Sequence, residues 1–169
     1  LYCLSFFIVN AAGNLDAQES RFRHIDRDEG LIHSGVSSIV QDSLGFIWIG
    51  TKNGLARYDG YTFISFQNDP FDTNSLSHNL VQTLYMDKNN ILWIGTYRGL
   101  NRFDPKTRTF TRYVHDPADS TSLSNDVVTA IGHDAEGRLW VGTLDGLNRL
   151  DEQSRTFTRY SSISQGKQV

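Results

Sequence analysis

Apolar residues recur along the chain in short runs, and the same series of runs occurs three times. In the second copy the runs are VQTLYMD, ILWIGT, GLNRFD and TFTRY. They are rich in β-branched and aromatic residues and have the length of ordinary strands. The segments between them, such as DKNN and DPKTRT, carry the residue types that favour turns. This pattern predicts a four-stranded antiparallel meander in each copy.

The copies align on three tryptophans, whose spacing falls in the range of roughly 40–50 residues that is typical of repeat proteins. Each tryptophan is preceded by an aspartate and followed by a glycine at fixed distances. We expect the aspartates to form turns by accepting backbone N–H bonds, and the tryptophans to pack between sheets. These residues are therefore predicted to be structural. They are Asp42, Asp87, Asp134, Trp48, Trp93, Trp140, Gly50, Gly95 and Gly142.

The second strands, FIWIG, ILWIG and RLWVG, are almost continuously apolar, which indicates that each sheet is covered on both faces. Four strands repeated at this period are typical of a β-propeller, so an all-β fold is predicted. The expected blades are about 30–67, 76–114 and 123–161, within a partial propeller at 18–169. Residues 21–26, RFRHID, match a fourth strand and are expected to complete a blade beyond this sequence. Since propellers have four to eight blades, the ring is expected to be incomplete here.

The first residues, LYCLSFFIVNAAGNLDAQ, combine an apolar run with small residues after it. This favours the remnant of a secretory signal peptide at 1–17, with a mature chain that begins near Gln18 outside the cytoplasm. The alternatives are a strand or a short membrane anchor, although the run is too short for a spanning helix. Cys3 is the single cysteine, so no intrachain disulfide is expected.

The net charge of −3 and the scattered Lys and Arg residues argue against binding to nucleic acid or to an anionic membrane surface. The histidines lack H-x-H and H-E-x-x-H spacing, and G-x-S-x-G and phosphate-binding glycine motifs are missing from the sequence. No catalytic residue, metal or cofactor is therefore expected.

The repeated pattern GLxxxxVxxIxxDxxGxxWIGTxxGLxRYDxxTxxFxxY resembles the two-component regulator propeller repeat. Asn90, where the repeat favours glycine, and the short turn DGYTF depart from it. The resemblance implies a propeller, usually seven-bladed, in the periplasmic sensor region of a hybrid two-component histidine kinase. Such sensors often detect carbohydrate breakdown products, and some relatives carry a diguanylate cyclase instead.

Applied to this chain, the resemblance implies the N-terminal part of an extracytoplasmic sensor domain that is itself non-catalytic. The full-length protein is then expected to be a homodimer anchored in the inner membrane. Its membrane-spanning and output segments would lie downstream of this sequence. Two alternatives remain open, namely an extracytoplasmic enzyme of the streptogramin-lyase type and a scaffold for protein contacts.

Ligand contacts are expected on one rim, where the copies differ. In a propeller, the loops that lead into the first strands share a face with the hairpins between the second and third strands, and loops on a rigid scaffold commonly carry binding residues. The candidates are Lys52, Asn53, Tyr97, Arg98 and Asp145 in the hairpins, and His33, His78, Asn79, Asn125 and Asp126 in the leading loops. Tyr97 and Arg98 form the best pair, because an aromatic face and a cation suit a polyhydroxylated or acidic sugar. The alternative is that these residues are ordinary solvated loop tips.

Overall fold

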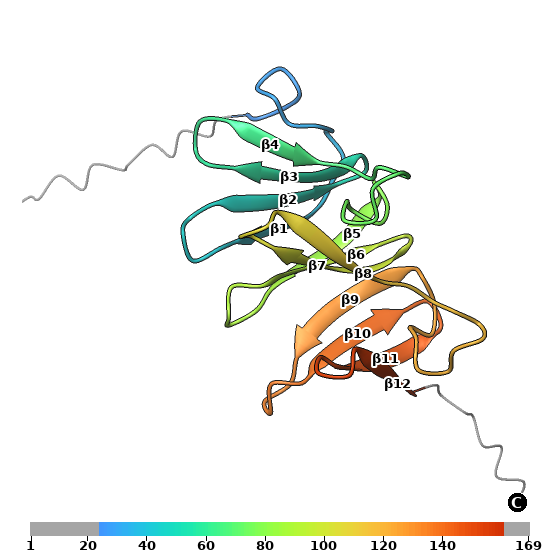
Figure 1. Cartoon of the computed structure of the whole chain (residues 1–169). Coiled ribbons are helices and arrows are strands. Elements are labelled where there is room, and N and C mark those ends of the chain that lie inside the picture. Colours follow the sequence, from blue (N-terminus) through green and yellow to red (C-terminus); the bar gives the residue numbers. More distant parts are fainter. Residues whose placement is uncertain (1–23, 161–169) are drawn as a thin grey trace, which may run out of the picture.

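The structure is a computed structural model that describes residues 24–160. Three separate four-stranded sheets succeed one another along this part of the chain (Figure 1). All pairings within a sheet are antiparallel, and the strand order follows the sequence, so each sheet is a meander. The prediction of an all-β fold built from propeller blades is confirmed.

The strand bounds define three blades. Blade 1 contains β1 (Val36–Gln41), β2 (Ile47–Thr51), β3 (Gly54–Tyr58) and β4 (Phe63–Phe66). Blade 2 contains β5 (Val81–Met86), β6 (Leu92–Thr96), β7 (Gly99–Asp104) and β8 (Thr109–Tyr113). Blade 3 contains β9 (Val128–His133), β10 (Leu139–Thr143), β11 (Gly146–Asp151) and β12 (Thr156–Tyr160).

The first strands of the blades are neighbours in space. β5 contacts β1 and β2 of blade 1, and β9 contacts β5 and β6 of blade 2. Long connections, 67–80 and 114–127, carry the chain from the last strand of one blade to the first strand of the next. The blades are thus arranged around β1, β5 and β9.

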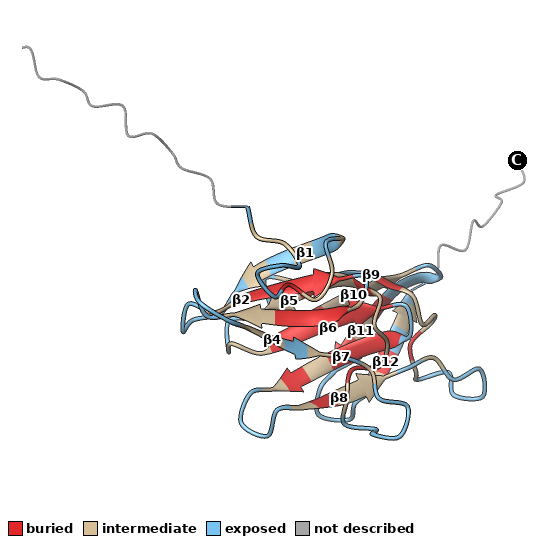
Figure 2. Ribbon diagram, turned by 90° about the horizontal axis from the view of Figure 1, so that it is seen from above, coloured by how far each residue is buried: buried red, intermediate tan, exposed pale blue. Residues whose placement is uncertain are grey.

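Two apolar layers hold the blades together. The layer between blades 1 and 2 includes Trp48, Leu55, Val81 and Phe103, and Trp48 meets the edge of Phe103 with 5.1 Å between ring centroids. The layer between blades 2 and 3 is built around Trp93, Leu100, Val128 and Val141. Every residue of β6 is buried, since blade 2 is covered on both faces (Figure 2).

The repeated glycines of the second strands are needed for this stacking. A Cβ atom on Gly50 would lie 2.6 Å from Cγ1 of Val81, and one on Gly95 would lie 2.7 Å from Cγ1 of Val128. The valine that opens the first strand of a blade therefore occupies the space left by the glycine of the preceding blade. We call this contact the valine–glycine contact.

Asn90 shows how the departure from the repeat is accommodated. It has a φ of 61°, in the left-handed region that the equivalent Gly45 and Gly137 also occupy. Asparagine tolerates this conformation better than most residues. Its Oδ1 also accepts a hydrogen bond from the backbone N–H of Ser43 in blade 1, at 2.8 Å. The substitution thus adds a polar link between two blades.

The predicted signal peptide at 1–17 and residues 21–23 of the predicted outer strand lie outside the described residues. His24, Ile25 and Asp26 are described and are not in a strand. The blade that the outer strand would complete is not among the three described sheets, so that pairing stays a prediction.

Candidate functional site

The two sets of rim loops meet at one end of the sheets. The backbone N–H of Lys52 donates to the carbonyl of Gly35, and that of Tyr97 donates to the carbonyl of Leu80. The same contact recurs in blade 3, where the N–H of Leu144 donates to Val127. Each hairpin between a second and a third strand is therefore bonded to the leading loop of its own blade.

The rim is also continuous from blade to blade. The N–H of Gly54 in blade 1 donates to the carbonyl of Asn79 in the leading loop of blade 2, at 2.7 Å. Gly99 and Asp126 repeat this bond at the same distance between blades 2 and 3. The candidate side chains on neighbouring hairpins are thus held by one connected backbone network.

Three candidates in the leading loops share one structural role. Nδ1 of His33 accepts a hydrogen bond from the N–H of Gly35 at 2.7 Å, and Nδ1 of His78 accepts one from Leu80 at 3.1 Å. In blade 3, Oδ1 of Asn125 accepts the equivalent bond from Val127 at 2.8 Å. In each of the three described blades, a side-chain acceptor in the leading loop thus bonds the backbone N–H two residues later. The residue that supplies the acceptor differs between blades.

Asn79 and Asp126 also hold the loops. Oδ1 of Asn79 accepts from the N–H of Asn68, and Oδ1 of Asp126 accepts from the N–H of His115, both at 2.7 Å. The hydrogen-bonding capacity of these two side chains is therefore partly used within the fold.

The hairpin candidates are more available to a ligand. Lys52, Tyr97, Arg98 and Asp145 are exposed, whereas Asn53 is half-buried. The threonine before each hairpin fixes the backbone, as when Oγ1 of Thr96 donates to the carbonyl of Gly99 at 2.9 Å. The exposed side chains therefore project from a rigid turn.

Tyr97, Arg98 and His78 are brought together on blade 2. The ring centroids of His78 and Tyr97 are 6.4 Å apart. Burial lowers the pKa of His78, and the nearby guanidinium of Arg98 lowers it further. His78 is thus favoured in its neutral form, with Arg98 as the cation of the group.

Arg98 also lines a cavity of about 280 Å³ beneath the connection 67–80. The other lining residues are Asn68, Pro70, Ser77, Arg112 and Val114. The lining thus includes two arginines and no acidic residue, so the cavity suits an oxygen-rich or anionic group.

Arg112 was not predicted as a site residue. Its Nε donates to the carbonyl of Ser75 and its guanidinium also donates to the carbonyl of Asp72, both at 2.8 Å. Arg159 makes the equivalent bonds to Ser122 and Asp119 in blade 3. The shared RTFTRY phrase contained this signal, since both copies place an arginine at the same position.

Asn101 and Ser77 form a buried polar pair next to the rim loops, which the sequence analysis did not predict. Oδ1 of Asn101 accepts from the N–H of Ser77 at 2.9 Å, while its Nδ2 donates to Oγ of Ser77 at 2.7 Å. Asn148 and Ser124 repeat both bonds in blade 3. Blade 1 has Ala56 and Ile32 at the two positions, and these pack together in an apolar cluster. Both partners of the polar pair are thus replaced together.

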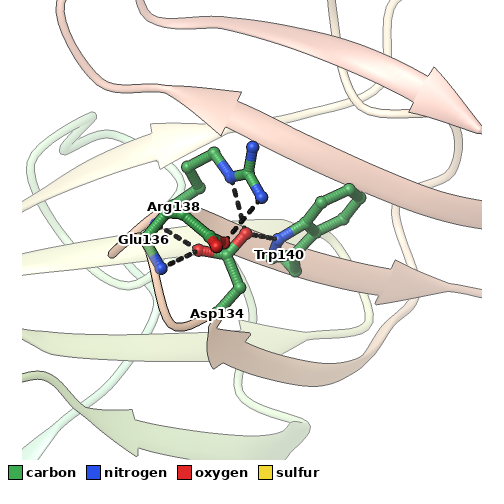
Figure 3. A network of polar contacts seen from close by, with 4 residues as sticks. All are labelled: Asp134, Glu136, Arg138 and Trp140. Atoms are coloured by element: carbon green, nitrogen blue, oxygen red, sulfur yellow. Dashed lines mark hydrogen bonds and ion pairs between the residues drawn. The ribbon is translucent and has the colours of Figure 1, made fainter.

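The repeated aspartates lie at the opposite end of the sheets and form turns. Figure 3 shows the turn of blade 3, in which Oδ2 of Asp134 accepts from Nε1 of Trp140 and from Nε of Arg138, both at 2.6 Å. Arg138 also donates to Glu136 at 2.8 Å. Partial burial alone would raise the pKa of Asp134. The bonds from Trp140 and from the backbone and side chain of Arg138 outweigh it, so the pKa lies well below its usual range.

Within residues 24–160, the acidic, histidine and cysteine side chains form no group of three or more that could hold a metal ion. The same part of the chain contains no helix with the length and apolar character needed to cross a membrane.

The sequence of this chain is similar to known proteins. The family model described as two component regulator propeller matches residues 30–53, 75–98 and 122–145. Histidine kinase P4 from Formosa agariphila is 41% identical over 66 residues, which are 38% of this chain and 5% of that protein.

Solved structures are similar to this chain as well. A crystal structure described as the extracellular domain of the hybrid two component system BT3049 from B. thetaiotaomicron has a TM-score of 0.77 and 32% identity. The match covers 84% of this chain and 20% of that chain. Virginiamycin B lyase from Staphylococcus aureus has a TM-score of 0.58 and 14% identity, over 78% of this chain and 43% of the lyase. At that identity the likeness concerns the fold alone. The chain spans only a small part of the two-component relatives that it matches.

Proposed function

The chain carries three repeats of the two component regulator propeller family, and on this basis we propose that it is part of a sensor domain outside the cytoplasm. This domain binds a small molecule and controls a two-component output across the membrane. The similarity to an extracellular domain of a hybrid system and to a histidine kinase supports this role. The chain covers 20% and 5% of these relatives, and the proposal assigns the output activity to segments outside the given sequence. The segment itself acts without catalysis and without a cofactor.

The observation that carries the proposed ligand site is the pair of exposed neighbours Tyr97 and Arg98, of which Arg98 also lines the cavity. Tyr97 is 45% exposed and offers an aromatic face to a sugar ring. Arg98 lines the cavity and offers N–H donors to hydroxyl or carboxylate oxygens. Arg112 adds a second positive charge to the lining, although its Nε and Nη2 already donate to backbone carbonyls. A carbohydrate, in particular one that carries a carboxylate, fits this combination.

In this proposal, ligand binding is transmitted through the bonded rim loops. A ligand changes the balance between two arrangements of a sensor only through its difference in affinity for them. Because the hairpins and leading loops are bonded across blades, a ligand that contacts two hairpins would favour one spacing between them. In the full-length homodimer, this preference would alter how the subunits sit on the output segments.

The test is calorimetric titration of the chain with short neutral oligosaccharides and short uronic-acid oligosaccharides. The double variant Tyr97→Ala/Arg98→Ala is expected to weaken binding at least tenfold, which corresponds to about 1.4 kcal/mol. The control is Lys88→Ala/Asn89→Ala, which alters two exposed side chains in the turn at the opposite end of blade 2 and should leave the affinity unchanged. Equal affinity of the wild type and the first variant would exclude the Tyr97–Arg98 site. Failure of every sugar to bind would exclude a carbohydrate ligand for this segment.

A further inference from the structure

A pocket of about 250 Å³ lies between the outer strands of blades 2 and 3. We call it the inter-blade pocket. One wall comes from β7 and β8 of blade 2, and the other comes from the turn between β11 and β12 of blade 3. The lining residues are Arg102, Thr111, Tyr113, Glu152 and Arg155. Both walls belong to described blades, and every lining residue carries a polar or charged group.

The wall formed by blade 2 is held in place by strand pairing and aromatic packing. Arg102 and Thr111 are direct partners in the pairing of β7 with β8, so their side chains lie on the same face of the sheet. The ring of Tyr113 packs against Trp93 of its own blade and meets the edge of Phe157 in blade 3, with 6.2 and 5.8 Å between centroids. The tyrosine is therefore fixed by the apolar layer that joins the two blades.

Between blades 1 and 2, the equivalent arginines lie over aromatic rings. The guanidinium carbon of Arg57, the counterpart of Arg102, is 4.3 Å from the ring centroid of Phe46. The guanidinium carbon of Arg108 is 5.8 Å from the ring centroid of Phe66. Both cations between these two blades are thus partnered by the fold through cation–π contacts.

The arginines of the inter-blade pocket lack such partners. Ile91 stands at the position of Phe46, so the ring that would lie next to Arg102 is missing. Arg155 occupies the same place in its turn as Arg108, and the two have φ angles of 60° and 59°. Within residues 24–160, neither Arg102 nor Arg155 makes a cation–π contact, a side-chain hydrogen bond or an ion pair. Their N–H donors are available to a ligand.

The charges in the pocket sum to an excess of one positive charge. Glu152 is the acidic member of the lining, and it is exposed and forms no ion pair with another described residue. Burial raises the pKa of the Tyr113 hydroxyl, and the nearby charges of Arg155 and Arg102 offset this only in part. The hydroxyl therefore stays protonated at neutral pH and can donate a hydrogen bond.

We propose that the inter-blade pocket binds a small molecule through a phosphate or sulfate group. The two guanidinium groups bind its oxygens from opposite walls, and the hydroxyls of Thr111 and Tyr113 complete the set of donors. Donors on several sides suit a tetrahedral group better than a carboxylate, which offers two oxygens in one plane.

This site is separate from the one proposed on the rim. The turn 152–155 follows β11, whereas the rim hairpin 144–145 precedes it, so the two lie at opposite ends of blade 3. The proposal therefore does not depend on the ligand proposed for Tyr97 and Arg98.

The test follows the arginine Nε–Hε signals of the chain by NMR during separate titrations with sodium phosphate, sodium sulfate and sodium acetate. Sodium chloride keeps the ionic strength constant, so general screening does not change. Phosphate or sulfate is expected to shift the signals of Arg102 and Arg155 in a saturable way, and acetate should bind more weakly than either. The tighter of the two tetrahedral ions identifies the kind of group that the pocket takes.

Substitutions in the lining give effects of opposite sign. Arg102→Gln and Arg155→Gln should each weaken binding about tenfold, because each removes a charged donor. Tyr113→Phe keeps the ring and removes one neutral donor, so the loss should be roughly threefold. Glu152→Gln should strengthen binding about twofold by removing a repulsive charge. A purely structural role of Glu152 would not produce this gain.

The matched control is Arg108→Gln, which makes the same change in the equivalent turn of blade 2. Both Arg108 and Arg155 are exposed, so the two variants are expected to fold, and far-UV circular dichroism checks this. Arg108→Gln and Tyr97→Ala/Arg98→Ala should bind phosphate and sulfate as the wild type does. The absence of saturable shifts with both ions would overturn the proposal. So would acetate binding as tight as theirs, or an equal loss in Arg108→Gln and Arg155→Gln.

Discussion

The carboxylate of Asp87 accepts a hydrogen bond from Nε1 of Trp93 at 3.4 Å, across the turn between β5 and β6. Its other oxygen accepts from the N–H groups of Asn89 and Ile91, at 2.8 and 2.9 Å. One side chain thus forms the turn and satisfies the indole N–H of the tryptophan that packs between blades. This relationship gives a reason for the constant spacing between the aspartate and the tryptophan in all three copies.

Loss of this carboxylate is expected to destabilise the chain. Asp87→Ala leaves two backbone N–H groups and the Trp93 indole without their acceptor, which costs about 1–3 kcal/mol. The change is measured as the shift of the urea unfolding midpoint. The control is Asn89→Ala, which changes an exposed side chain of the same turn and should stay within about 0.5 kcal/mol of the wild type. Equal effects of the two substitutions would argue against the proposed role of the carboxylate.

The buried pair of Asn101 and Ser77 allows a sharper test. Asn101→Ala leaves the buried backbone N–H of Ser77 without its acceptor, whereas Oγ of Ser77 keeps its bond with Oγ1 of Thr96. The loss should cost about 1–3 kcal/mol. Adding Ser77→Ile reproduces the alanine and isoleucine that blade 1 carries at these positions, and should recover part of the loss. A double-mutant cycle in urea measures the coupling, which is expected to be about 0.5–3 kcal/mol. Strict additivity would show that the two side chains do not act as a pair.

Gly95 should tolerate no side chain. A Cβ at this position would lie 2.6 Å from Cγ2 of Thr83 and 2.7 Å from Cγ1 of Val128, so Gly95→Ala forces blades 2 and 3 apart. Overpacking of this kind typically costs about 1–3 kcal/mol. Gly132→Ala is the control, because a Cβ there meets no atom within 4 Å. Thermal unfolding compares the two, and a Gly95→Ala variant as stable as Gly132→Ala would refute the close approach of the blades.

His78 is expected to make stability depend on pH. Burial and Arg98 lower its pKa in the folded state, so folding disfavours the protonated ring. The stability associated with the neutral ring is present above the unfolded pKa of about 6.5 and is lost as the pH falls through the lower, folded value. Protonation of Nδ1 would also remove the acceptor of the Leu80 N–H.

His78→Asn isolates this effect, because Asn125 performs the same role in blade 3. The variant should keep the loop and show a smaller loss of melting temperature between pH 8 and pH 5.5 than the wild type. His24→Asn alters a side chain that is 87% exposed and serves as the control. Identical pH profiles for the wild type and His78→Asn would exclude His78 as the source.

The repeat made much of the fold predictable. Local signals were strong, because the turns between the first and second strands carry glycine or asparagine at their positive-φ positions, as Gly45 and Asn90 show. The family resemblance drawn from the same repeat is confirmed by the matches to two component regulator propeller repeats and to an extracellular domain of a hybrid system. Candidate site residues were less predictable, because a loop position does not reveal where its side chain finds a partner. His33, His78 and Asn125 are different residues that accept the same backbone bond.

The sequence by itself determined the number of described blades, their strands and the continuous cover of β6, since periodicity and turn residues act over a few neighbouring positions. Only the tertiary structure decided which side chains meet between blades and on the rim. Val81 lies over Gly50, and Arg112 and Arg98 line one cavity. Contacts of this kind depend on the angle and separation between sheets, which are set by packing of the whole apolar layer and not by any short stretch of the chain.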